Sequence, residues 1–137
     1  MERNAIVLDA SIIIKWFTKE EKRDSALKIR EDYINKQIEI IIPDLILYEI
    51  SNALRFNPNF TKEDVSEAIY SIYNMDMTII TPTQEIIDEA LHISYLYKTS
   101  IYDSIYIALA KIIDSDFITA DKKLYEKTKE ISNVNLL

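Results

Sequence analysis

The stretch SIYDSIYIALAKIIDSDFITAD, residues 100 to 121, decides the fold class of this chain. Its first part, Ser100 to Ile113, is apolar on nearly every side, which is typical of a helix inside a protein. The apolar run Phe117 to Thr119 then predicts a short, buried parallel strand. Asp121 follows where the next helix begins. This order predicts an α/β domain with a polar site beyond the carboxyl ends of its strands.

The rest of the chain alternates between strands and helices in the same way. Apolar runs predict strands at Asn4–Leu8, Ile38–Ile42, Met77–Ile80 and, as an edge strand, Val134–Leu137. Periodicity and turn signals predict helices at Ser11–Phe17, Glu20–Asn35, Thr61–Asn74, Gln84–Tyr97 and Asp121–Glu130, and one from the N-cap Asp44 to Phe56. The apolar faces are expected at Ala26, Leu27, Ile29, Tyr33 and Ile34, and at Ile86, Ile87, Ala90, Leu91 and Leu96. The pattern predicts one doubly wound α/β domain over residues 1–137.

Composition excludes several classes of function. The chain has no glycine, so phosphate-cradling loops and dinucleotide fingerprints are absent, and no cysteine, so thiolate chemistry is excluded. A single histidine, His92, argues against multi-histidine metal sites and histidine-based triads. Carboxylate chemistry is nearly all that remains.

Charge and hydropathy bound the location and the partners. No apolar run reaches the roughly 18 residues of a membrane span, and Glu2, Arg3 and Asp9 interrupt the start of the chain, so we expect a cytoplasmic protein without a membrane contact. The net charge of −7 argues against a broad basic face that coats nucleic acid. Any contact with nucleic acid is therefore expected to be local.

Four acids, Asp9, Glu49, Asp103 and Asp121, are expected to meet at one end of the sheet. Glu49 lies on or beside an apolar helix stripe, where a buried carboxylate needs a metal or a charged partner. Asp103 lies on the internal helix and shares a face with Tyr106. For Asp9, Asp103 and Asp121, the alternative is that each only caps a helix. Together the four predict a site for a divalent metal.

Other polar residues lie near these acids in the sequence. The hydroxyls of Ser11 and Thr119 could orient a carboxylate or a metal-bound water, although a helix cap and an ordinary strand residue are the alternatives, the latter favoured for Thr119. Four cationic side chains near the acids could bind phosphate, and the alternative is that each is a solvated surface charge: Lys15, Arg55, Lys122 and Lys123.

Three strings across nearly the whole chain, VLDASIIIKWF, PDLILYEISNAL and YDSIYIALAKIIDSDFITADKKLY, together resemble the PIN domain family, most closely its VapC-like toxins. The resemblance implies a three-layer α/β/α sandwich with a mostly parallel sheet of four to five strands. It also implies that Asp9, Glu49, Asp103 and Asp121 are the catalytic acids, with Ser11 and Thr119 as supporting hydroxyls. One departure is the segment 113–116, which replaces a glycine that many relatives carry.

The function implied is that of a Mg²⁺- or Mn²⁺-dependent endoribonuclease, the toxin of a toxin–antitoxin pair. Hard cations prefer carboxylate and water ligands, and one or two of them could activate a water against an RNA phosphodiester, leaving a 3′-hydroxyl and a 5′-phosphate. Asp9 and Asp103 are expected as direct ligands. The resemblance further implies a small VapB-like antitoxin and a homodimer, for which an apolar surface near Trp16 and Phe17 or near Leu54 and Phe56 would be suitable.

Three other kinds of protein are alternatives to a PIN-like ribonuclease. A receiver domain needs a phospho-acceptor after the third strand, where this chain has Thr81-Pro82-Thr83. A haloacid-dehalogenase-type phosphatase needs Asp-x-Asp after the first strand, where this chain has Asp9-Ala10-Ser11. A catalytically weak PIN-like binding module, acting through RNA or protein contacts, has the same acids and is separated from an enzyme only by nuclease activity.

Overall fold

A computed structural model describes residues 4–137, so Glu2 and Arg3 lie outside the described residues. Within that range the strands are β1 (Asn4–Leu8), β2 (Ile38–Pro43), β3 (Thr78–Ile80), β4 (Asp116–Thr119) and β5 (Val134–Leu136). The helices are α1 (Ala10–Ile14), α2 (Arg23–Ile34), α3 (Leu45–Arg55), α4 (Lys62–Asn74), α5 (Gln84–Tyr97), α6 (Ile101–Ile112) and α7 (Lys122–Thr128). None of these helices has the length and apolar character needed to cross a membrane.

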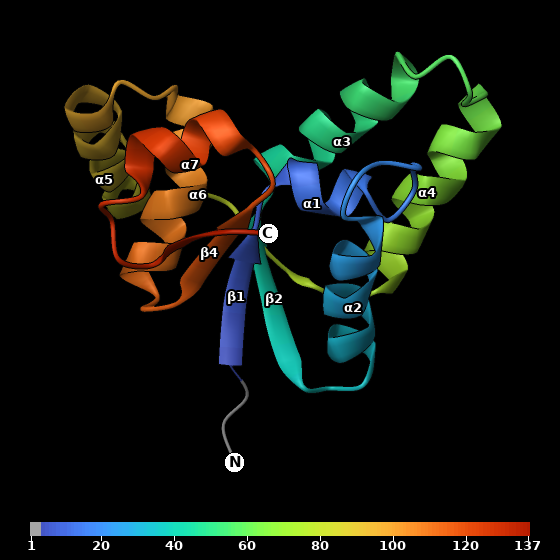
Figure 1. Cartoon of the computed structure of the whole chain (residues 1–137), viewed down its shortest axis with the longest axis horizontal. Coiled ribbons are helices and arrows are strands. Elements are labelled where there is room, and N and C mark those ends of the chain that lie inside the picture. Colours follow the sequence, from blue (N-terminus) through green and yellow to red (C-terminus); the bar gives the residue numbers. More distant parts are fainter. Residues whose placement is uncertain (1–3) are drawn as a thin grey trace.

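The five strands form one parallel sheet in the order β3-β2-β1-β4-β5. Helices α1 to α4 lie on one side of it and α5 to α7 on the other, which gives three layers (Figure 1). The predicted α/β/α sandwich is therefore confirmed, and β5 is the predicted edge strand. Because β1 and β4 are neighbours, with Val7 beside Phe117, the turns that follow them lie next to each other at one edge of the sheet.

Helix α6 packs inside the molecule, as its apolar sequence predicted. Every residue from Ser104 to Ala110 is buried. The ring of Tyr106 stacks on Phe117 of β4, with centroids 6.0 Å apart. The end of strand β1 is equally enclosed, since Val7 and Leu8 have no exposed surface. Packing therefore leaves the backbone next to Asp9 and Asp103 little freedom to move.

Several local predictions are confirmed and others are wrong. Thr61 and Asp64 form the predicted capping box of α4. The side chain of Asp44, predicted to cap α3, makes no cap hydrogen bond; the residue has helical torsions, and its carboxylate instead accepts a hydrogen bond of 3.4 Å from the Thr81 hydroxyl. Helix α1 is shorter than expected, because the chain leaves it after Ile14 in tight turns.

The predicted apolar faces of α2 and α5 are also wrong in part. Ile34 is 61% exposed, Leu91 40% and Leu96 60%. In α5 the buried positions are Ile86, Ala90 and Ile93, a spacing of four and three residues that continues one stripe. Leu91 and Leu96 lie beside that stripe, so they face outward.

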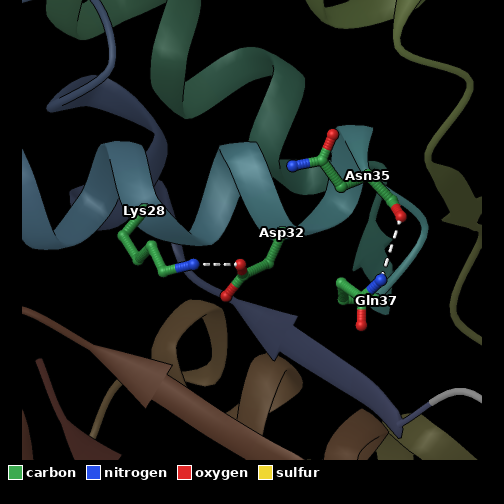
Figure 2. Close-up of polar contacts among 4 residues, drawn as sticks. All are labelled: Lys28, Asp32, Asn35 and Gln37. Atoms are coloured by element: carbon green, nitrogen blue, oxygen red, sulfur yellow. Dashed lines mark hydrogen bonds and ion pairs between the residues drawn. The ribbon is translucent and has the colours of Figure 1, made fainter.

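A chain without glycine has to turn with other residues in left-handed backbone. Lys22, Lys36, Asp76, Lys98 and Asp114 all have positive φ angles, between 53° and 61°. Asp114 lies in the segment that departs from the family pattern, so an aspartate takes the conformation that glycine adopts most easily there. Figure 2 shows the turn between Asn35 and Gln37, where the side-chain amide of Gln37 donates to the backbone carbonyl of Asn35 at 3.3 Å. In the same view Lys28 and Asp32 form an ion pair of 2.6 Å on α2.

Candidate active site

Asp9 follows β1 and is held by hydroxyl and amide donors. One of its carboxylate oxygens, Oδ1, accepts hydrogen bonds from the Ser11 amide, at 3.0 Å, and from the Ser11 hydroxyl. The other, Oδ2, accepts a hydrogen bond of 2.5 Å from the hydroxyl of Thr119. Only 7% of Asp9 is exposed, and Thr119 is fully buried. The carboxylate therefore has one fixed orientation.

The same two hydroxyls join the ends of β1 and β4. Ser11 Oγ accepts a hydrogen bond of 2.9 Å from the Ala120 amide, and Thr119 Oγ1 accepts one of 3.0 Å from the Asp121 amide. Each hydroxyl is thus a donor toward Asp9 and an acceptor from a backbone amide of the turn that follows β4. Thr119 is therefore more than an ordinary strand residue, because its side chain joins the Asp9 carboxylate to the backbone amide of Asp121.

Asp121 is the N-cap of α7. Its Oδ1 atom accepts hydrogen bonds from the amides of Lys123 and Leu124, at 3.0 and 3.1 Å. No residue among 4–137 donates a hydrogen bond to its second oxygen, and the side chain is exposed. Asp9 likewise caps α1. Both acids therefore cap helices, and Asp121 still has an oxygen free for another ligand.

Glu49 and Asp103 come from the two helices that face each other above the sheet edge. The hydroxyl of Tyr106 donates a hydrogen bond of 2.5 Å to Glu49 Oε1, which joins α3 to α6. Asp103 lies in the first turn of α6, where its amide donates to the N-cap Ser100 hydroxyl at 3.0 Å. Both acids are half-buried.

The pKa values indicate that the acids act on one another. Burial is the main reason that the pKa of Asp9 is raised to about 6. The hydroxyl donors oppose this rise, and the charge of Asp103 contributes to it. Burial also raises the pKa of Glu49, with a smaller contribution from Asp103. The pKa of Asp103 is raised by burial and by Asp121. Asp103 thus interacts with each of the other three carboxylates.

A cleft of about 790 Å³ opens between α3 and α6 beside these acids. Glu49 and Asp103 form part of its wall, and Arg55 lies at the same cleft. The other three candidate cations, Lys15, Lys122 and Lys123, do not line it. Of the four predicted phosphate-binding side chains, Arg55 alone lines this cleft.

The sequence interpretation missed two residues of this site. Tyr106 was noted only as a neighbour of Asp103 on the helix face, although its burial raises the pKa of its hydroxyl and keeps it a donor to Glu49. Lys127 is close enough to lower the pKa of Asp103, and its ammonium donates to the Lys98 carbonyl at 3.2 Å. Lys127 is 24 residues from Asp103 in the sequence, with a strand and a turn between them, so no local pattern indicated it.

The donor set fits a hard divalent cation. Its side chains supply only carboxylate oxygens, which Mg²⁺ and Mn²⁺ prefer, and their mutual repulsion is what a bound cation offsets. Among residues 4–137 no three acidic or histidine side chains already form a metal-ligand group. Because Ser11 and Thr119 hold Asp9 in place, the other three carboxylates would move toward the ion when it binds.

Comparison with known proteins identifies the family. The PIN domain pattern matches residues 6–130. The chain belongs to the PIN domain family. Ribonuclease VapC3 from Pyrobaculum aerophilum is 25% identical over 126 residues, which cover 89% of this chain and 93% of that protein. The predicted resemblance to PIN domains, and to VapC proteins among them, is confirmed.

Solved structures share the fold of this PIN domain. The toxin–antitoxin complex from Klebsiella pneumoniae contains a chain that matches with a TM-score of 0.71 at 18% identity, over 94% of each chain. VapC20 from Mycobacterium tuberculosis, a toxin that cleaves the sarcin–ricin loop, matches with a TM-score of 0.66 at 12% identity. That match covers 88% of this chain and 93% of VapC20.

Proposed function

We propose that this PIN domain is a Mg²⁺- or Mn²⁺-dependent endoribonuclease and the toxin of a toxin–antitoxin pair. The observation that carries the proposal is the convergence of four acids from four separate segments, three of them with raised pKa values, with Glu49 and Asp103 in the wall of one cleft. Similarity to a VapC ribonuclease supports RNA as the substrate.

The four carboxylates have distinct parts in this proposal. Asp9 and Asp103 would bind the metal directly, and Glu49 and Asp121 would complete the cluster directly or through water. When bound, one or two such ions would supply positive charge to the scissile phosphate and lower the pKa of an attacking water. Hydrolysis would then leave a 3′-hydroxyl and a 5′-phosphate.

The protein's own hydrogen bonds prepare these ligands. Thr119 and Ser11 occupy both oxygens of Asp9, so its carboxylate needs no reorientation when a substrate arrives. Tyr106 holds Glu49 in the same way from α6. Lys127 sets the charge around Asp103 from outside the cluster. Such partners typically change metal affinity by about 10- to 100-fold when removed.

Partners and location follow from the same proposal. The Klebsiella relative is part of a toxin–antitoxin complex, which supports a VapB-like antitoxin for this chain, and the action on RNA supports a cytoplasmic location. Of the apolar residues considered for such contacts, Trp16 and Leu54 are buried and Phe56 is 70% exposed. A homodimer is also proposed, with Phe56 available to either contact.

Isothermal titration with Mn²⁺ tests the metal site without any RNA. We expect one or two ions to bind the natural sequence, and at least tenfold weaker binding to Asp9→Asn and Asp103→Asn. Asp116→Asn, an exposed acid at the opposite end of β4, is the control and should bind normally. Equal affinity in all four proteins would reject the site. Metal binding without cleavage of any RNA would instead favour the PIN-like binding module.

A further inference from the structure

The cleft between α3 and α6 carries two exposed tyrosines beside the catalytic acids. Tyr48 directly precedes Glu49 on α3, and Tyr102 directly precedes Asp103 on α6. We propose that this cleft is a subsite for an unpaired base of the RNA, which stacks on Tyr48 and Tyr102. The inference rests on the proposed function and adds to it the residues that select single-stranded RNA.

Helical spacing directs the polar and aromatic residues of α3 into the cleft. Tyr48, Asn52 and Arg55 are spaced by four and three residues, so they share one face of the helix, and Glu49 lies three residues before Asn52 beside that face. The cleft is lined by that face on one side and by the first turn of α6 on the other. Its volume of about 790 Å³ lies within the range of about 300–1,000 Å³ that ligand sites occupy.

The two tyrosines leave large aromatic rings in contact with water, and packing of the core does not account for this. Tyr48 is 75% exposed and Tyr102 63%, whereas Tyr106, one turn from Tyr102, is buried. Neither exposed hydroxyl forms a hydrogen bond with any residue in the described part of the chain. The two rings lie on opposite walls of one cleft, and neither is part of the core. A flat ring of a ligand can stack on rings that are placed in this way.

Charge decides which part of a nucleotide goes where. Without a metal, Glu49 and Asp103 repel phosphate, so the scissile phosphate belongs at the metal and the base beyond it, toward the tyrosines. Arg55 is the single cation among the residues that line the cleft, and its guanidinium lies 4.9 Å from the centre of the Phe56 ring. In a chain with a net charge of −7, stacking therefore has to supply affinity that basic residues supply elsewhere.

The preference for an unpaired base follows from geometry. A base inside a duplex is already stacked on both sides, so it can reach neither tyrosine, whereas every unpaired base offers a free face. Asn52 adds an exposed amide that makes no side-chain hydrogen bond within residues 4–137 and can pair with the edge of a base.

A second groove, of about 740 Å³, lies between α3 and α4 and also contains exposed tyrosines, Tyr70 and Tyr73. None of the four acids lines it, so an RNA held there would have no carboxylate next to its backbone. Its tyrosines are therefore assigned no part in the subsite, and Tyr70 provides a control of similar exposure.

The test measures binding apart from cleavage. Fluorescence anisotropy follows a fluorescein-labelled hexauridylate with a backbone that cannot be hydrolysed, an abasic analogue of it and a GC-rich RNA duplex long enough to stay paired, all with Mn²⁺ so that the metal offsets the repulsion between phosphate and the acids. We expect Tyr48→Ala and Tyr102→Ala each to weaken binding of the single strand roughly tenfold, and Tyr48→Phe and Tyr102→Phe to keep it. Tyr70→Ala should bind as the natural sequence does. The abasic analogue and the duplex should bind weakly to every variant.

Cleavage with Mn²⁺ separates this inference from the proposed function. If the subsite is correct, the alanine variants raise KM for single-stranded RNA with little change in kcat, because stacking acts equally before and during the reaction. Cleavage by the natural sequence together with unchanged binding by both alanine variants would overturn the subsite and keep the nuclease. Tyrosine-dependent binding without cleavage would keep the subsite and overturn the nuclease. Absence of any binding would overturn the subsite.

Discussion

Replacement of Asp9 by asparagine should make the metal-free protein more stable at neutral pH. Burial raises the pKa of Asp9 from 3.8 to about 6, so ionisation of this carboxyl costs more in the folded protein than in the unfolded one. At about 1.4 kcal/mol per pKa unit, the ionised carboxylate lowers the free energy of unfolding by about 3 kcal/mol. Asparagine has nearly the same shape and, like a protonated carboxyl, is uncharged, with a carbonyl oxygen as acceptor and an NH₂ group as donor toward Ser11 and Thr119.

The sign of the pH dependence is fixed by the direction of the shift. At pH 3 and below, Asp9 is protonated in both states and costs nothing. As the pH rises from about 3 to about 6 the unfolded state ionises first, so the natural sequence loses stability, and the full penalty is present at pH 7. The advantage of Asp9→Asn should therefore be about 3 kcal/mol at pH 7.5 and close to zero at pH 3.

Urea unfolding in EDTA at these two pH values measures the difference. Asp121→Asn is the matched control: its carboxylate lies at the same edge of the sheet but is exposed, and asparagine caps a helix about as well as aspartate does. It should change the free energy of unfolding by less than about 0.5 kcal/mol. If the natural sequence is as stable as Asp9→Asn at pH 7.5, the burial of an ionised carboxylate is not the cost that we describe.

Metal should reduce this difference in stability. An ion that binds only the folded protein adds about 2.7 kcal/mol when its concentration is 100 times Kd. With Mn²⁺ at that level the natural sequence should gain this amount, and Asp9→Asn, which binds at least tenfold more weakly, should gain no more than about 1.4 kcal/mol. A penalty that metal binding offsets is the expected mark of a site that sacrifices stability for function. An equal gain in both proteins would mean that Mn²⁺ binds somewhere else.

Three further changes have distinct expected results. Tyr106→Phe removes the donor to Glu49 and should weaken Mn²⁺ binding about tenfold in calorimetry; unchanged affinity would refute its positioning role. Lys127→Gln removes a cation that lowers the pKa of Asp103, so carbon NMR titration of the metal-free protein should give Asp103 a higher pKa, and a lower one would contradict the assignment. Lys36→Gly, in the turn after α2, should raise the free energy of unfolding by about 0.5 kcal/mol, since Lys36 has a φ of 61°, whereas Lys28→Gly inside α2 should lower it by about 1 kcal/mol.

The fold was predictable because strand and helix signals alternate without a break. Buried strands such as β1 and β4 read as continuous apolar runs, and α6 reads as an internal helix. Partly buried helices were less predictable: the periodicity of α5 allowed Leu91 and Leu96 to face inward, and only packing against α6 selects Ile93 instead. Sequence gives the period of a helix more reliably than its rotation about its own axis.

The candidate site was predictable as a set of acids but not as a set of contacts. The acids follow strands or lie on apolar helices, and those positions can be read locally. The bond from Thr119 to Asp9 spans 110 residues, and the bond from Tyr106 to Glu49 spans 57. Such pairs depend on which strands are neighbours in the sheet, so local patterns cannot indicate them. Asp44 shows the converse: its residue type favours a cap, but its helical torsions (φ −60°, ψ −23°) leave the side chain without a cap hydrogen bond.

Cleavage of a labelled single-stranded RNA tests the central claim most directly. The purified natural sequence and Asp103→Asn, prepared identically, are incubated with Mn²⁺, with Mg²⁺ and with EDTA. The account predicts cutting by the natural sequence with either metal, none in EDTA, and none by Asp103→Asn under any condition. Equal cutting by both proteins, or no cutting by either across RNAs of different sequence, would contradict it.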